Sequence, residues 1–304
     1  MPSTSFFTTH DGDVILRATQ EPSPTQDFRV HKLILSLASP VFKDMFTLPE
    51  SPDQNRTEPP EIPVVDVPDS PQIVDTILRF IYPGVEPPKV SSVATLAALF
   101  STADKYNITP IHPVLKASMK TFLPRNSFMV YITACRFGLL EEAMEAARVS
   151  TPSSILKPGD DEAVQHVSGP DLYRFIRFVQ ERDHQGRSII KQKLGWSYVT
   201  RDCDCPHWEG GEDFYFGLTR VAQDEFVENP CLHPKDLLMV LNKVPDPPLG
   251  CDPQPNSAEW YYKRGDNGGF SCPFSPMSIR DKLMGLVVEL GELECSLLGQ
   301  AFGE

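Results

Sequence analysis

The residues best suited to metal chemistry are cysteines and histidines in the C-terminal half of the chain. Cys203, Cys205 and His207 alternate within five positions, and Cys231 and His233 follow as a second short pair. Zinc prefers four thiolate or imidazole ligands in a tetrahedron, commonly supplied by two short pairs. The C-x-C and C-x-H spacings here differ from the usual C-x₂₋₄-C and H-x₃₋₅-H. A structural zinc site is one interpretation, and a set of reduced, partly buried thiols is the other.

Motifs of the common enzyme classes do not occur in the sequence. It contains no G-x-S-x-G nucleophile elbow, no H-E-x-x-H helix, no P-loop and no dinucleotide-binding glycine pattern. A zinc-dependent enzyme built on the cysteines and histidines would also need an acid or base beside the metal. We therefore expect a protein that is not an enzyme and has no cofactor beyond the possible structural zinc.

The elements that could position functional residues are clearest near the N-terminus. Residues 14–16 and 28–30 are short apolar or alternating runs typical of strands, and the Pro-containing spacer 21–24 between them predicts a loop. His31 and Lys32 then open a run whose apolar spacing predicts a helix.

A second short helix is predicted directly after the first. Ser39 suits the N-cap and Pro40 the first helical position. Phe42, Met45 and Phe46 follow at i, i+3 and i+4, so we expect them to share one buried face.

Further elements continue the pattern downstream. Residues 62–67 predict a strand, and residues 96–106 and 111–123 predict helices. An amphipathic helix is predicted between this strand and residue 83, and Pro83-Gly84 would end it. On the helix that ends before Pro83, the residues expected to face inward are Ile73, Ile77, Leu78 and Phe80.

These motifs closely resemble those of the BTB/POZ family. The family has a D-V strand, an F-x-x-H-K strand-to-helix turn, an S-P-x-F-x-x-M-F helix and an F-x-Y-x-G turn, and each occurs here in that order. The family's L-x-x-A-D-K-Y helix is resembled by residues 96–106, LAALFSTADKY. The resemblance covers residues 10–125 and implies an α+β fold, a small sheet flanked by helices. It also implies a protein-binding module. The residues given structural roles by the resemblance are His31, Pro40, Phe42, Met45, Phe46, Tyr82, Gly84, Asp104 and Tyr106.

The resemblance also implies a charged pocket near a dimer interface, lined by Asp13 and Lys32. Two partly buried opposite charges tolerate burial only together, because removing one can cost about 3–5 kcal/mol. The alternative is an ordinary exposed salt bridge, worth about 0–1 kcal/mol. His31 is interpreted as structural, since no acid–base partner lies near it in the sequence.

A possible cullin-binding site follows the second helix. Family members that recruit a cullin scaffold carry a hydrophobic-x-Glu triplet in this loop, and Leu48 and Glu50 match it, although the family spacing is usually a few residues longer. The surrounding Pro-rich loop could also supply such a triplet by accident. Only about ten residues precede Asp11, so homotypic association is expected without the swapped strand that some family members use.

Composition bounds the remaining possibilities. The 304 residues suffice for two domains, and the 40% of apolar residues argues against general disorder. The 41 acidic residues exceed the 28 basic ones, and after Arg125 the counts are 27 and 17. Because nucleic-acid binding needs a positive surface to displace phosphate counterions, we expect no nucleic-acid partner.

Signals for export or membrane insertion are also missing. Residues 1–13 lack the basic and apolar segments of a signal peptide, and no apolar run reaches the ~18 residues of a membrane span. We expect a cytoplasmic or nuclear protein whose seven cysteines stay reduced, with no membrane partner.

The chain is predicted to contain four parts. Residues 10–125 form the BTB unit, 126–150 a short helical extension broken near Gly138, 151–170 a Pro-containing linker, and 171–304 a mostly helical domain of unknown type. The last helix is expected to start near Ser278, with Asp281 completing a capping box. The cysteine and aromatic pattern of this C-terminal part resembles that of BTB proteins expanded in fungi.

Two functional hypotheses follow, beside the disfavoured zinc enzyme. In the first, the BTB unit self-associates and docks a cullin-type ubiquitin ligase, while the C-terminal region holds an unknown partner protein. In the second, the chain is a homotypic scaffold or a transcription-associated regulator without a ligase role.

Overall fold

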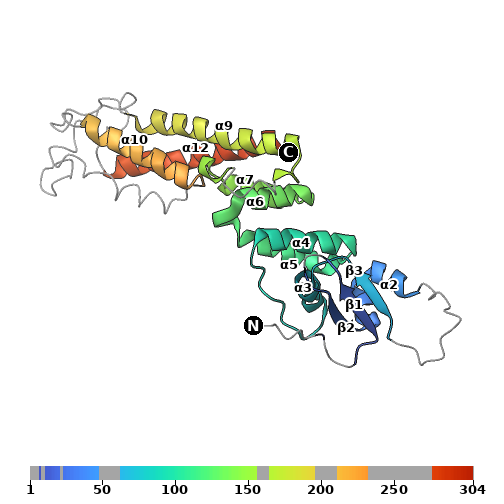
Figure 1. The fold of residues 1–304 in the computed structure, drawn as a ribbon. Helices are drawn as coiled ribbons and strands as arrows, with labels where there is room; N and C mark the ends of the chain where they lie inside the picture. Colours follow the sequence, from blue (N-terminus) through green and yellow to red (C-terminus); the bar gives the residue numbers. More distant parts are fainter. Residues whose placement is uncertain are drawn as a thin grey trace, which may run out of the picture. The chain divides into compact units, whose positions relative to one another are not determined.

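The computed structural model describes residues 7, 11–20, 23–47, 62–155, 164–195, 211–231 and 276–303 (Figure 1). The chain divides into two compact units, Met1–Asn126 and Ser127–Glu304. The division falls at Asn126, whose backbone (φ −134°, ψ 36°) interrupts helix α6 (Leu123–Arg136).

The first unit contains a three-stranded sheet in the order β2-β1-β3. Strand β1 (Val14–Ala18) pairs antiparallel with β2 (Gln26–Val30) and parallel with β3 (Val64–Val67). Alternate residues of β1 are buried, as the period of a half-buried strand requires. Leu16 lies opposite Phe28 on one side and Val65 on the other, and Leu16 and Phe28 are both in the core.

Among the described residues of this unit, the sheet is accompanied by the helices α1 (Lys32–Ala38), α2 (Pro40–Thr47), α3 (Pro71–Ile81), α4 (Val93–Lys105) and α5 (His112–Lys120) (Figure 1). A 3₁₀ turn, η2 (Thr109–Ile111), precedes α5. The sheet with its flanking helices and the helical second unit confirm the predicted fold class.

Serine caps fix where the helices begin. The Phe42 amide donates a 3.0 Å hydrogen bond to Ser39 Oγ, which confirms the predicted N-cap of α2. Ser70 and Ser92 accept equivalent bonds at the starts of α3 and α4. The caps satisfy amides that have no partner inside the helix.

The buried faces of α2 and α3 differ partly from expectation. Met45 is 38% exposed, so the prediction that it shares the buried face of Phe42 is wrong. The Phe42 ring stacks on Tyr106 (centroids 4.7 Å apart) and on Phe46 (6.1 Å), and this narrow contact leaves Met45 outside. On α3, Ile77 and Leu78 are buried, Ile73 and Phe80 are half-buried, and Val74 joins the core.

The described residues of the second unit form helices and short turns. After α6 come α7 (Leu140–Val149), a 3₁₀ turn η3 (Pro152–Ser154), α9 (Gly169–Leu194), α10 (Gly211–Glu228) and α12 (Pro276–Phe302). Gly138 separates α6 from α7 with φ +66°, as the predicted break requires. The long helices α9 and α12 lie side by side (Figure 1).

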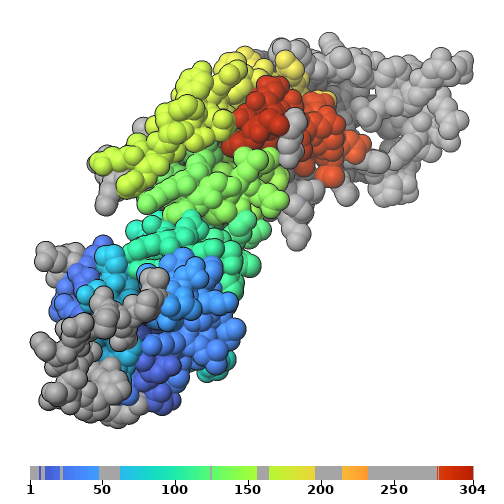
Figure 2. Space-filling model, turned by 90° about the vertical axis from the view of Figure 1, so that its right-hand side faces the viewer, coloured from blue at the N-terminus to red at the C-terminus, as the bar shows by residue number. Residues whose placement is uncertain are grey.

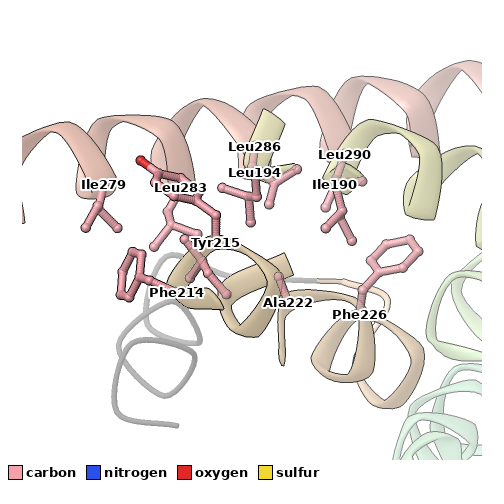
Figure 3. Packing of buried hydrophobic residues seen from close by; sticks show 11 residues of the cluster. Ile190, Leu194, Phe214, Tyr215, Ala222, Phe226, Ile279, Leu283, Leu286 and Leu290 are labelled. Atoms are coloured by element: carbon pink, nitrogen blue, oxygen red, sulfur yellow. The ribbon is translucent and has the colours of Figure 1, made fainter. Parts of the chain in front are cut away.

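The core of this unit is apolar (Figure 3). It joins α9, α10 and α12 through the buried residues Ile190, Leu194, Phe214, Tyr215, Leu218, Ala222, Phe226, Ile279, Leu283, Leu286 and Leu290. The predicted capping box is wrong, because α12 already begins at Pro276 and Ser278 lies inside it. No helix in the described ranges is long and apolar enough to cross a membrane.

Candidate protein-interaction surfaces

A cluster of polar contacts fixes the corner between β2 and α1. The His31 amide donates a 2.7 Å hydrogen bond to the Tyr82 hydroxyl, which also lies 3.2 Å from His31 Nδ1. Burial raises the pKa of Tyr82, so the hydroxyl keeps its proton and can donate it to Nδ1. His31 Nε2 faces the Asp11 carboxylate at 3.8 Å, which suits a tautomer protonated at Nε2. His31 therefore joins the end of α3 to the start of α1.

Asp13 acts at the same corner. Its Oδ1 accepts a 2.7 Å hydrogen bond from the Lys32 amide, the first residue of α1. A carboxylate at this position satisfies an unpaired amide and interacts favourably with the helix dipole. The Lys32 ammonium lies 5.8 Å from the Phe46 ring centroid. The described contact between Asp13 and Lys32 thus runs through the backbone, and a charged pocket at a dimer interface stays a prediction.

Asp69 connects the segment before α3 to α4. Its carboxylate accepts hydrogen bonds from Thr102 Oγ1 (3.2 Å), Lys105 Nζ (2.9 Å) and the Tyr106 hydroxyl (2.7 Å). Ser39 Oγ donates to the Tyr106 carbonyl at 2.5 Å. Burial, and then the bond to Asp69, raise the pKa of Tyr106 well above its usual range. The network therefore holds α2 and α4 together through a neutral tyrosine.

Other predicted structural residues lie at the surface of the first unit. The Asp104 carboxylate is 3.2 Å from His112 Nε2, between α4 and α5. Gly84 is exposed with φ +77°, a conformation that favours glycine in the turn after α3. Pro40 is the exposed first residue of α2.

The outer face of α1 is apolar. Leu33 and Leu37 lie one turn apart, and their exposed fractions are 70% and 79%. The opposite face is fixed in the core by Leu35, which is fully buried. Two adjacent exposed leucines on a short, well-anchored helix are typical of a surface that another protein covers.

The family model of the BTB/POZ domain matches residues 6–123. Residues 6–123 are a BTB/POZ domain. The match agrees with the resemblance expected from the motifs, and BTB/POZ domains form a protein-interaction family that is generally not enzymatic. No curated protein matches the chain.

The candidate cullin site of the BTB domain, Leu48 and Glu50, lies outside the described residues. Helix α2 ends at Thr47, directly before it. Four of the five candidate zinc ligands, Cys203, Cys205, His207 and His233, also lie outside the described residues. Both sites stay predictions.

Cys231, the fifth candidate ligand, lies in a polar cluster of the second unit. Its Sγ is 3.4 Å from the Arg148 carbonyl and 3.4 Å from Glu294 Oε1. Arg148 forms a 3.3 Å ion pair with Glu294. Burial, and then the Glu294 charge, raise the pKa of Cys231 to about 11, so the thiol is a neutral donor here. Within the described ranges, no group of three or more potential ligands could hold a metal ion.

Arg182 of α9 completes this cluster. It is only 2% exposed, and its guanidinium donates to the carbonyl oxygens of Ala147, Arg148 and Ser150 at the end of α7. The last carbonyls of a helix lack helical partners, and here only the Ala147 carbonyl also accepts a backbone amide, that of Ser150. Arg182 therefore caps α7 and meets its negative end with a positive charge. Burial lowers the pKa of Arg182.

The sequence did not predict the roles of Asp69 and Arg182, the two residues at the centres of these polar clusters. Asp69 precedes Ser70-Pro71, a sequence that signals a helix start but not the identity of the partners. Arg182 occurs in a mixed-charge stretch that predicts a solvated helix face. No local pattern distinguishes it from Arg174, Arg177 and Arg187 of the same helix, which are not buried.

Proposed function

We propose that the chain is a non-enzymatic adaptor. Its BTB domain self-associates and docks a cullin-type ubiquitin ligase, and its C-terminal helical region holds a partner protein. The match to the BTB/POZ family supports a general role in protein–protein interaction. The observation that carries self-association is the pair of exposed leucines on α1, Leu33 and Leu37.

The physical argument for self-association rests on α1. Burying two leucines that are mostly exposed contributes about 1.5–3 kcal/mol each. A symmetric dimer would bury the leucine pair of both copies, because both copies present the same surface. A stable interface buries about 1,200–2,000 Å² in total, so α1 would form its centre and neighbouring polar residues its rim.

The ligase link is supported by sequence position alone. Leu48 and Glu50 follow α2 in the sequence, as the triplet of cullin-recruiting family members does, although the family spacing is usually a few residues longer. An exposed leucine would supply apolar contact, and the glutamate would orient the partner. Without this link the chain would be a homotypic scaffold.

Calorimetric titration tests the ligase link. The full chain is titrated with a cullin N-terminal domain, beside a Leu48→Ala/Glu50→Ala variant and a control variant, Leu140→Ala, which removes an exposed leucine of α7. We expect micromolar or tighter binding by the wild type and the control, lost in the double variant. If the wild-type chain does not bind, the adaptor role is wrong and the homotypic scaffold remains.

A further inference from the structure

An open groove runs between α9 and the C-terminal part of α12. Its volume is about 420 Å³, within the range of ligand-binding clefts. Helix α9 contributes Tyr173, Arg177, Glu181 and Gln185 to its lining, and α12 contributes Leu297 and Gln300. Figure 2 shows the yellow-green α9 beside the red α12.

Arg177 is the unneutralised cation of this groove. It is exposed, and no described residue forms a hydrogen bond or ion pair with its guanidinium. Its neighbour Arg174 is different, since it pairs with Asp171 at 2.8 Å and lies 5.8 Å from the Phe302 ring centroid. Glu181 accepts a hydrogen bond from Gln185. Arg177 is therefore free to bind an anionic group.

The apolar part of the groove lies beside Arg177. Tyr173 precedes Arg177 by one helical turn, and 66% of its surface is exposed. Phe178 and Leu297 are buried residues of the groove lining. Tyrosine and arginine are the residue types most enriched where protein interfaces concentrate their binding energy.

The length of the groove favours a peptide over a small anion. The lining residues of α9 extend from Pro170 to Gln185, a distance of about 22 Å at 1.5 Å per residue. An extended peptide covers this distance with about seven residues. A single carboxylate at Arg177 would leave most of the groove unfilled.

We propose that this groove binds an acidic peptide segment of a partner protein. A partner carboxylate pairs with Arg177, and an adjacent apolar side chain packs against Tyr173 and Leu297. This inference rests on the proposed function, in which the C-terminal region holds a partner, and it adds the place and the chemistry of that partner.

Peptide selection tests the inference with the full chain as bait. A phage-displayed library of random 12-residue peptides is selected on the wild-type protein. Selected peptides are then synthesised and their affinities are measured for wild type, Arg177→Glu, Tyr173→Ala and Arg220→Glu. Arg220 is the matched control, because its side chain is 85% exposed on α10 and the substitution changes the net charge equally.

We expect peptides rich in Asp and Glu with an apolar residue, bound at least about tenfold more weakly by Arg177→Glu and by Tyr173→Ala. Arg220→Glu should bind them like the wild type, and added salt should weaken the wild-type affinity. Equal weakening by both arginine variants, or a selection without acidic peptides, would overturn the inference. Neither outcome affects self-association through α1 or cullin binding. The experiments therefore distinguish a groove that does not bind acidic peptides from a chain that is not an adaptor.

Discussion

The Tyr106 hydroxyl donates a 2.7 Å hydrogen bond to the Asp69 carboxylate, which also accepts from Thr102 and Lys105. This single carboxylate fixes two side chains of α4 and that of its C-cap residue, Tyr106, against the segment that starts α3. Because Ser39 binds the Tyr106 carbonyl, the start of α2 depends on the same tyrosine. The packing of α2 and α4 in this domain thus depends on a polar contact beside an apolar core.

Removing this contact should destabilise the BTB domain. Asp69→Ala leaves the Tyr106 hydroxyl, Thr102 and Lys105 without their acceptor, and we expect the free energy of unfolding to fall by about 2–3 kcal/mol. Tyr106→Phe keeps the ring stack on Phe42 and should cost about 1–2 kcal/mol. Denaturant unfolding of both variants measures these losses, and Asp27→Ala, in an exposed pair with Arg17, is the control. Losses no larger than that of the control would contradict the assignment.

Asp13 should matter more for stability than its exposure implies. Asp13→Ala removes the acceptor for the first amide of α1, and loss of such a cap costs about 0.5–2 kcal/mol. Asp13→Asn keeps an acceptor oxygen but loses the charge, so its cost should be smaller. We still expect Asp13→Asn to lower stability or association more than Asp27→Asn does. Equal melting shifts for these two asparagine variants would rule out a special role for the Asp13 charge.

Arg182 should be the most sensitive arginine of the second unit. Arg182→Ala removes the guanidinium from three carbonyl groups at the end of α7 and leaves the Ser150 carbonyl without that donor, and Glu294 loses a nearby positive charge. We expect a loss of about 3–5 kcal/mol in the free energy of unfolding, the range for breaking a buried charged cluster. Arg220→Ala on the exposed face of α10 should stay within about 0.5 kcal/mol of the wild type. Chemical denaturation followed by circular dichroism distinguishes the two, and similar midpoints would contradict the capping role.

Cys231 should make stability depend on alkaline pH. Its pKa is raised from 9.0 to about 11 in the folded chain, so between these values the folded state binds a proton that the unfolded state has released. Stability from this group is therefore fully present below about pH 9 and is lost as the pH rises to about 11. Cys231→Ala should lose less stability than the wild type over this interval. Identical pH profiles, measured by thermal unfolding, would show that the thiol is not linked to folding.

Most of the BTB fold follows from local sequence patterns. Alternating residues in β1, the Ser39-Pro40 start of α2 and the Gly138 break are each decided by a few neighbouring residues, and the structure has them where they were predicted. The burial of individual side chains on the short helices was less predictable. Met45 has the correct helical spacing for the core, but a two-turn helix buries only the face that its partner Tyr106 covers.

The polar centres could not be predicted because their partners are distant in sequence. Asp69 lies 33–37 residues from the groups that it binds, and Arg182 lies 32–35 residues from the carbonyls that it caps. Their identity depends on how helices pack, which no local pattern encodes. The exposed leucines of α1 were likewise expected only as part of a helical apolar run.

We propose that the BTB domain associates through α1, and the assembly state of the chain tests this directly. Sedimentation equilibrium of the full chain should give a dimer or larger assembly, and Leu33→Asp/Leu37→Asp should convert it to a monomer with unchanged circular dichroism. Met284→Asp/Val288→Asp, which alters exposed apolar residues of α12, should leave the assembly intact. A wild-type chain that is monomeric at high micromolar concentration, or a double leucine variant that still assembles, would contradict the account.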